Sequence, residues 1–180
     1  MCQAESLAIV PGTIPIASIV ADSAEATGLK WAAPAGGSTF VGANVRLDGS
    51  VSIANDTQVI IGWNAENIDS NGFHDNSTNN SRLTVPSGKG GKYLVTCQIE
   101  YAGNSTGVRS AQIRINNDLK MLTESSGQGS TAQTILISGT FNLNASDYVE
   151  IWTVQTSGGS LNLNGGSLWN SNFTISYLGA

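Results

Sequence analysis

The sequence has 180 residues, of which 40% are hydrophobic and 12% are charged, so it allows one sizeable core and predicts a single main domain. Gly, Ser, Thr and Asn are abundant, which is typical of a sheet protein with many tight turns. Eight Lys and Arg stand against thirteen Asp and Glu, and no basic cluster occurs, so nucleic acid is not an expected partner.

Residues 1–38 are predicted to form an irregular N-terminal anchoring or stem segment, ahead of a domain at residues 39–180. Branched apolar side chains in this segment follow no helical period, and its prolines prevent one. The segment has no basic start and is interrupted by proline and glycine, so it fits neither a secretory signal nor a membrane span. We therefore expect a chain made and folded in a cytosol, without membrane insertion. Small residues at 34–38 predict a hinge.

The apolar side chains of the N-terminal segment predict contact with another surface, because exposed apolar residues in such number need a cover. Four of them, Ile14, Ile16, Ile19 and Trp31, are the candidate anchoring residues. The sequence does not decide between two surfaces that could bury these side chains. One is another chain, either a copy of this one around a symmetry axis or a larger scaffold, and the other is the chain's own domain.

From Phe40 onward, short runs of β-branched and aromatic residues are separated by Gly, Asn, Asp and Ser, a pattern typical of an all-β sandwich. Alternation is clearest at residues 93–101, where every second side chain belongs to an apolar face that we expect in the core. No stretch has the period of an amphipathic helix. About ten strands are predicted, at residues 41–47, 58–64, 82–85, 93–101, 108–115, 119–123, 132–143, 148–155, 161–163 and 172–178.

The order of these elements resembles the globular head of complement component C1q and its tumour-necrosis-factor-like (TNF-like) relatives. The resemblance covers about residues 40–180 and rests on Phe73-His-Asp75, Thr84-Val-Pro86, Gly91-Lys-Tyr93, residues 143–149 and Ser171-Asn-Phe173. The sequence departs from the family at Leu94 or Val95, where a second aromatic residue is usual, and at Ala145-Ser146, where glycine is usual. The resemblance implies a ten-strand antiparallel jelly roll that assembles as a homotrimer, with both chain ends near one end of the trimer.

Eight aromatic or apolar side chains are expected to pack in the core or in the trimer interface. They are Trp63, Phe73, Tyr93, Cys97, Tyr101, Trp152, Phe173 and Tyr177. Trp63 and Trp152 are predicted to lie in strands, where packing is favoured over ligand contact, and Cys97 is expected to be a buried thiol. Trp31 and Trp169 are predicted outside strands. Trp169 lies in a loop of Gly, Asn and Ser, where subunit contact is favoured over receptor contact.

A second resemblance concerns the N-terminal segment. The stretch from Ile19 to Pro34 is similar to a segment common in bacteriophage tail-fibre and other virion structural proteins, where it precedes variable tips. Together, the two resemblances imply a virion protein made in the host cytoplasm. It would be a homotrimeric phage tail fibre or appendage, attached to other virion structural proteins through its N-terminal segment. Its position on the particle is left open.

Three predicted loops are expected to face outward from the domain, at residues 103–106, 124–130 and 155–160. The candidate receptor-binding residues, which would contact a host-surface glycan or protein, are Asn104, Ser105, Thr106, Gln128 and Trp169. Three weak sites on one trimer would supply avidity. Two alternatives remain. One is a purely structural capsid or tail decoration protein without receptor binding, and the other is a polysaccharide-cleaving tip, which the lack of catalytic motifs disfavours.

Patterns for catalysis or metal binding are weak in this sequence. His74 is the only histidine and no Gly-x-Ser-x-Gly turn occurs, so no hydrolase triad is predicted and the chain is expected not to be an enzyme. We interpret His74 as a surface-loop residue and not as a metal ligand or a pH sensor. Calcium binding is left open, because four side chains in this region could supply oxygen ligands: Asp69, Asn71, Asp75 and Asn76. The spacing of a twelve-residue calcium loop is missing, and no other cofactor is predicted.

Overall fold

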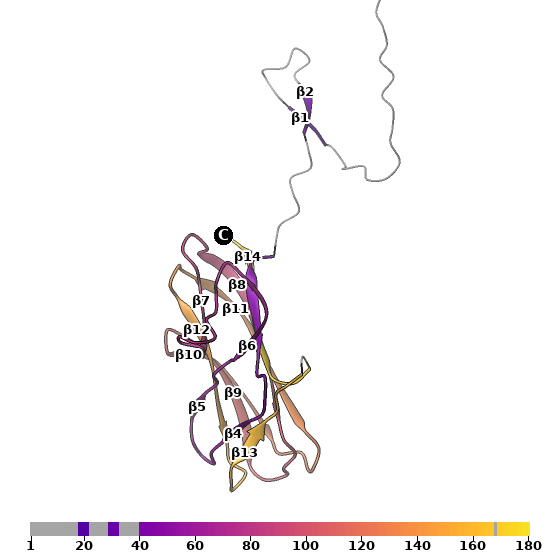
Figure 1. Ribbon diagram of the computed structural model, residues 1–180, viewed down its shortest axis with the longest axis vertical. Coiled ribbons are helices and arrows are strands. Elements are labelled where there is room, and N and C mark those ends of the chain that lie inside the picture. Colours follow the sequence, from indigo (N-terminus) through magenta and orange to yellow (C-terminus); the bar gives the residue numbers. More distant parts are fainter. Residues whose placement is uncertain (1–17, 22–28, 33–39, 168) are drawn as a thin grey trace, which may run out of the picture. The chain divides into compact units, whose positions relative to one another are not determined.

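The computed structural model describes residues 18–21, 29–32, 40–167 and 169–180 (Figure 1). The chain divides into two compact units, Met1–Thr39 and Phe40–Ala180, and we call the second unit the head. Among the described residues, no helix has the length and apolar character needed to cross a bilayer.

In the first unit, β1 (Ser18–Ala21) pairs antiparallel with β2 (Leu29–Ala32). The expectation of an irregular segment is therefore wrong at these residues. Ile19 and Trp31 are partners in the register of this hairpin, so Trp31 lies in a strand and not outside one as predicted. The other two candidate anchoring residues, at positions 14 and 16, and the predicted hinge lie outside the described residues.

The head is a sandwich of two antiparallel sheets (Figure 1). The strands of the larger sheet follow the order β4-β13-β8-β14-β3-β6, and β11 also pairs with β8. Their bounds are β3 Gly42–Arg46, β4 Val51–Ile53, β6 Ala65–Ser70, β8 Gly91–Tyr101, β11 Gln133–Leu143, β13 Leu161–Leu163 and β14 Asn172–Gly179. The central strand of this sheet is β8, because it pairs with β11, β13 and β14.

The smaller sheet has the strand order β10-β9-β12-β5, with β7 also paired to β12. Its bounds are β5 Val59–Ile60, β7 Arg82–Thr84, β9 Val108–Ile115, β10 Asp118–Ser126 and β12 Tyr148–Gln155. From β4 to β9 the chain changes sheet at every connection. This connectivity makes the head an antiparallel jelly roll, the fold class that the sequence predicted.

The head has twelve strands, β3 to β14, where the sequence predicted about ten. The sequence pattern does not reveal β4, which has three residues with two of them exposed, or β6, which is a polar edge strand. The strand predicted at residues 58–64 is shorter, because only Val59–Ile60 pairs with β12. Trp63 therefore lies outside the strands, contrary to the prediction, although its side chain is fully buried.

Alternation along β8 builds one wall of the core. Its inward side chains, at every second position of residues 93–101, are at most 1% exposed, as the pattern predicted. The adjacent strand β14 adds Phe173, whose ring centroid lies 5.7 Å from that of Trp63. The opposite wall comes from inward residues of β9 and β12, including Ile113 and Ile151. Burial of this apolar surface between two sheets is the main force that holds the sandwich together.

The register of β8 defines the two ends of the head. Lys92 pairs with Gly179 near the C-terminus, and Gly42, at the start of the first head strand, pairs with Ser176. Both ends of the head's chain therefore lie at one end of the sandwich, which we call the proximal end (Figure 1). Because β8 has 11 residues, its other end at Tyr101 lies about 35 Å away and marks the distal end.

We predict that Phe173→Ala lowers the free energy of unfolding by about 3–5 kcal/mol, because it removes a buried ring and leaves a cavity beside Trp63. The measurement is chemical denaturation at one fixed protein concentration. Ser50→Ala, at an exposed loop position, is the control and should change stability by less than about 0.5 kcal/mol. A Phe173→Ala protein as stable as this control would contradict the packing described.

Candidate functional site

Three loops meet at the distal end of the head, and we call them the distal loop cluster. They cover residues 102–107, 127–132 and 156–160. The Gly127 N–H donates to the carbonyl of Gly107 over 2.8 Å, which joins the first two loops. Thr156 joins the third, because its N–H donates to the Val108 carbonyl over 3.0 Å and its hydroxyl accepts from the Val108 N–H over 2.8 Å.

These loops correspond to the three regions that the sequence predicted as outward-facing, with bounds that differ by up to three residues at their ends. Residues 124–126 belong to β10, and Gln155 belongs to β12. Asn104, Ser105 and Thr106 lie in the first loop, and Gln128 lies exposed in the second. The structure therefore brings four of the five candidate receptor-binding residues to one end of the molecule.

The fifth candidate, Trp169, lies elsewhere. Its side chain is 74% exposed, and its carbonyl accepts a hydrogen bond from the side chain of Gln98 on the outer face of β8. It is not among the residues that line the hollow of the distal loop cluster. Trp169 therefore lies apart from the other four receptor-binding candidates, and its role stays a prediction.

A hollow with a volume of about 300 Å³ lies between two of the distal loops. We call it the distal hollow, and its lining residues are Gly103, Asn104, Ser105, Thr106, Gly129 and Ser130. The loops approach each other closely, because a Cβ atom on Gly103 would lie 2.1 Å from the Ser130 carbonyl oxygen. The lining consists of hydroxyl, amide and peptide groups, which bind hydroxyl-rich or charged ligands through hydrogen bonds.

Arg109, at the start of β9, braces the first distal loop from inside. Its side chain is 1% exposed, and its Nη1 donates to the carbonyls of Thr106 at 2.7 Å and Val108 at 3.2 Å. Its Nη2 donates to the carbonyl of Asn104 at 3.0 Å. Burial lowers the pKa of Arg109, while the nearby phenol of Tyr101 acts to raise it. Sequence analysis did not identify this residue, because a single arginine beside an apolar strand gives no local signal.

Tyr101 supports this arrangement from the end of β8. Its ring centroid lies 5.8 Å from the Arg109 guanidinium carbon, and its hydroxyl forms a hydrogen bond with the Thr153 hydroxyl. The Thr153 hydroxyl in turn donates to the carbonyl of Ser110. Burial raises the pKa of Tyr101 to about 12, so the phenol stays neutral and continues to act as a hydrogen-bonding group. The distal loops thus rest on a layer of buried, hydrogen-bonded polar groups, in which the Nε of Arg109 has no hydrogen-bond partner among the described residues.

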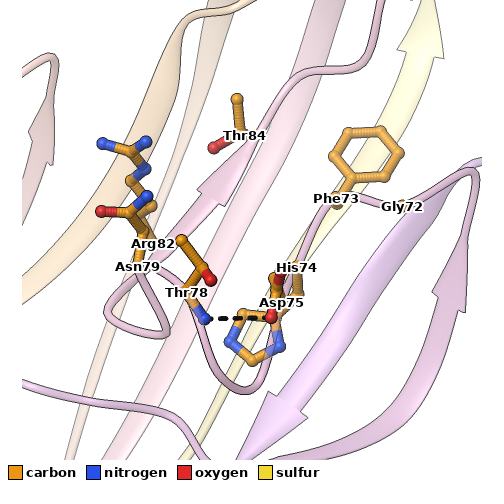
Figure 2. A pocket seen from close by; sticks show the side chains of 8 residues that line it. All are labelled: Gly72, Phe73, His74, Asp75, Thr78, Asn79, Arg82 and Thr84. Atoms are coloured by element: carbon orange, nitrogen blue, oxygen red, sulfur yellow. Dashed lines mark hydrogen bonds between the residues drawn. The ribbon is translucent and has the colours of Figure 1, made fainter.

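A second hollow, the lateral hollow, lies on the side of the head and has a volume of about 220 Å³ (Figure 2). Its lining residues are Gly72, Phe73, His74, Asp75, Thr78, Asn79, Arg82 and Thr84. Figure 2 shows Arg82 and Asn79 on one side and Phe73 on the other. The Arg82 guanidinium stacks on the ring of Tyr148 with a distance of 4.6 Å to the ring centroid.

His74 is not the surface-loop residue that the sequence predicted, because its side chain is fully buried. Its Nδ1 lies 3.0 Å from a carboxylate oxygen of Glu66, and its Nε2 lies 3.1 Å from the carbonyl oxygen of Asn80. Both neighbours are acceptors, so a ring protonated at both nitrogens donates to each of them. His74 therefore ties the loop at residues 71–81 to β6, and it contacts no candidate nucleophile.

The carboxylates that we considered as calcium ligands already accept hydrogen bonds from groups of the same turn. Asp69 accepts from the N–H groups of Phe73 at 2.9 Å and His74 at 3.1 Å. Asp75 accepts from the hydroxyl and N–H of Ser77 and from the N–H of Thr78, and these hydrogen bonds lower its pKa to about 2. In the described part of the chain, no three His, Cys, Asp or Glu residues are arranged to hold a metal ion. Calcium binding therefore gains no support from this loop.

The expected packing residues lie mainly inside the head itself. Six of them are at most 1% exposed and belong to its core: Trp63, Phe73, Tyr93, Cys97, Tyr101 and Phe173. Tyr177 is half-buried, with its ring centroid 5.2 Å from that of Tyr93. Trp152 is half-buried on the smaller sheet, where the Arg114 guanidinium stacks 4.6 Å from its ring centroid. Cys97 is a free thiol, and burial raises its pKa.

The fold is similar to that of a solved structure described as "Structure of Eiger TNF from S. frugiperda". The match has a TM-score of 0.59 and 16% sequence identity, and it covers 78% of this chain and 93% of that chain. No family model matches the sequence, and no curated protein matches it. The likeness shows that the head has a TNF-like jelly-roll fold, which agrees with the resemblance found in the sequence.

We predict that Gly107→Ala destabilises the distal loop cluster. Gly107 has a φ of 72°, and an added Cβ atom would lie 1.8 Å from the Thr156 carbonyl oxygen. Gly129→Ala is the matched control, because Gly129 has a φ of 86° but nothing within 4 Å of such an atom. Both variants carry about 1 kcal/mol of backbone strain. Thermal unfolding should show a clearly larger loss for Gly107→Ala, and equal losses would contradict the close contact with Thr156.

We predict that the Asp75 turn weakens only in strong acid. Because the pKa of Asp75 is lowered from 3.8 to about 2, its contribution to stability is fully present above pH 3.8 and is lost as pH falls toward 2. The native carboxyl should titrate near pH 2 in a ¹³C NMR titration. The difference in unfolding midpoint between the parent protein and Asp75→Asn should become smaller as pH falls from 3.8 toward 2. A gap that stays constant down to pH 2 would argue against these hydrogen bonds.

Proposed function

We propose that this chain is a homotrimeric appendage tip of a bacteriophage virion, which contacts a host-surface glycan or protein through the distal loop cluster. The observation that carries the proposal is the placement of the distal hollow, about 35 Å from the end at which residues 1–39 join the head. A head attached through its N-terminal side presents these loops away from the attachment. The similarity of residues 19–34 to phage tail-fibre segments supports the virion assignment.

Two different apolar surfaces support assembly into a ring. One is the edge of the smaller sheet, where Leu119 and Leu122 of β10 are 47% and 50% exposed. The other is the outer face of the larger sheet, with Leu136 on β11, Ile68 on the edge strand β6 and Leu178 on β14, which are 69%, 53% and 58% exposed. Contact between two unlike surfaces is head-to-tail and closes into a ring when the rotation fits. TNF-like folds typically form trimers, which supports three subunits.

The distal hollow supports binding as the role of the head. Its hydroxyl, amide and peptide groups match a polar ligand, and three copies on one trimer turn weak contacts into useful avidity. We propose no catalytic role, because the imidazole of His74 is enclosed between Glu66 and Asn80. A polysaccharide-cleaving tip would release reducing sugar ends, which the proposal does not expect.

The trimer is tested by size-exclusion chromatography with light scattering on residues 1–180 and 40–180. For the full chain, we expect three times the mass of 18.7 kDa of one chain. Leu136→Asp should lower the mass, because it places a charge in the proposed interface. Ser160→Asp, at an exposed distal position, should leave the mass unchanged. A stable monomer across micromolar concentrations would overturn the trimer.

Binding is tested on immobilised bacterial capsule, lipopolysaccharide and teichoic acid preparations. We expect the full-length protein to bind at least one preparation, and we expect Ser130→Trp to reduce that binding by about tenfold or more, because it fills the distal hollow. Ser87→Trp, at an exposed position outside the distal loop cluster, is the control. A trimer that binds none of these surfaces, nor whole host cells, would indicate a decoration protein with a structural role only.

A further inference from the structure

We propose that the distal hollow binds an acidic sugar unit through its carboxylate, with the positive charge of Arg109 beneath the hollow as the selecting element. This inference rests on the proposed glycan binding and names the ligand class of the same site. It is carried by three observations: the burial of Arg109 without a counter-charge, the lack of any other charge in the distal loops, and the orientation of the loop peptides.

The first observation is that Arg109 is a buried cation without an acidic partner. Within residues 40–167 and 169–180, no Asp or Glu oxygen lies within ion-pair distance of its guanidinium, and its Nε has no hydrogen-bond partner. Its other contacts are with the backbone carbonyls of residues 104, 106 and 108 and with the ring of Tyr101. Burying a guanidinium without a carboxylate is unfavourable, and a neutral side chain could donate to the same carbonyls. A ligand that carries the missing negative charge explains why this position is charged.

The second observation is that the distal loops carry no charge other than that of Arg109. Among residues 101–109, 125–134 and 151–163, which build these loops and their strand ends, Arg109 is the only charged side chain. Acidic residues adjoin these segments: Glu100, Glu124 on β10, and Asp56, whose N–H donates to the Gln155 carbonyl. The Glu100 carboxylate accepts hydrogen bonds from the side chains of Asn164 and Asn170. Arg109 is therefore the only charge within the loops that line the hollow.

The third observation concerns the peptide groups of the loop at residues 102–107. The carbonyls of Asn104 and Thr106 point inward to Arg109. The chain has no cis peptide bonds in its described part, and in a trans peptide the N–H points opposite to the carbonyl. The N–H groups of Ser105 and Gly107 therefore point away from the guanidinium, toward the exposed side of the loop. The N–H of Thr106, which lies between them, donates to the Asn104 Oδ1 over 2.8 Å, so the N–H groups of residues 105 and 107 are the two that can donate to an anion.

The lining of the hollow favours a sugar as the carrier of this anion. The hydroxyls of Ser105, Thr106 and Ser130 and the amide of Asn104 surround the hollow, and its described lining has no aromatic or aliphatic wall. Such a lining satisfies the hydroxyls of a sugar ring and gives no anchor for an apolar peptide side chain. The volume of about 300 Å³ leaves room for a ring as well as its carboxylate. A hexuronic acid within a surface polysaccharide combines both features.

The experiment uses the full-length protein and three matched probes: methyl β-D-glucuronide, the methyl ester of the same sugar, and methyl β-D-glucoside. Only the first carries a charge, and all three carry the same ring. NMR titration should give a dissociation constant about tenfold lower for the glucuronide than for either neutral sugar. The N–H signals of Ser105 and Gly107 should shift most. Higher salt should reduce the preference.

Two variants test whether the preference comes from the distal hollow. Ser130→Asp adds a negative charge to the lining and should abolish the preference for the glucuronide, whereas Ser87→Asp, at an exposed position outside the distal loop cluster, should not. Arg109→Gln keeps a donor for the loop carbonyls but removes the charge, so it should make the three affinities equal. If Arg109→Gln does not fold, as judged by circular dichroism, the Ser130→Asp comparison still decides the point.

The possible outcomes separate this inference from the proposed function. Equal binding of the three sugars, with binding to a surface polysaccharide retained, overturns the acidic-sugar assignment and leaves the glycan-binding role intact. Inorganic phosphate that binds as tightly as the glucuronide also overturns it, because the site would then select an anion and not a sugar. Failure to bind every sugar, polysaccharide and host cell overturns the proposed function itself.

Discussion

The alternation of side chains along β8 is the constraint on which the rest of the head depends. This strand pairs with three neighbours, and its inward residues form one wall of the core. A slip of one residue would turn Gln98 and Glu100 into the core and expose Tyr93 and Tyr101, so the register is strongly fixed. The same register places the C-terminus beside one end of β8 and the distal loops beyond the other.

That fixed register makes the distal end a rigid platform. The loops there have no sheet of their own, and they are held by contacts with each other and by Arg109, which lies beneath them beside Tyr101. Loops on such a scaffold vary in sequence with little effect on the core. The lateral hollow differs, because Asp69 and His74 use their polar groups to hold the surrounding turn.

The sequence predicts the fold class and most strands because apolar alternation records which face is buried. It fails at β6, Ala65–Ser70, an edge strand without apolar alternation that pairs with β3 through its backbone and through the side chains of Asn67 and Ser70. It also fails at His74, which lies among polar residues but is covered by β6 and Asn80 in the folded chain. The loops were identified because glycine, asparagine and serine mark turns. Arg109 was missed because its burial depends on strands distant in the sequence, and no local pattern records it.

The position of β14 has a consequence for the order of folding. This strand, Asn172–Gly179, is the last strand of the head along the chain, yet it lies in the interior of the larger sheet, between β8 and β3. Because a polypeptide is synthesised from its N-terminus, β3 and β8 emerge before the strand that joins them. Until β14 emerges, the two strands are separated by a gap, and Val45 and Cys97 lack their partner Phe173. Co-translational folding can therefore begin on the smaller sheet, but the larger sheet closes last.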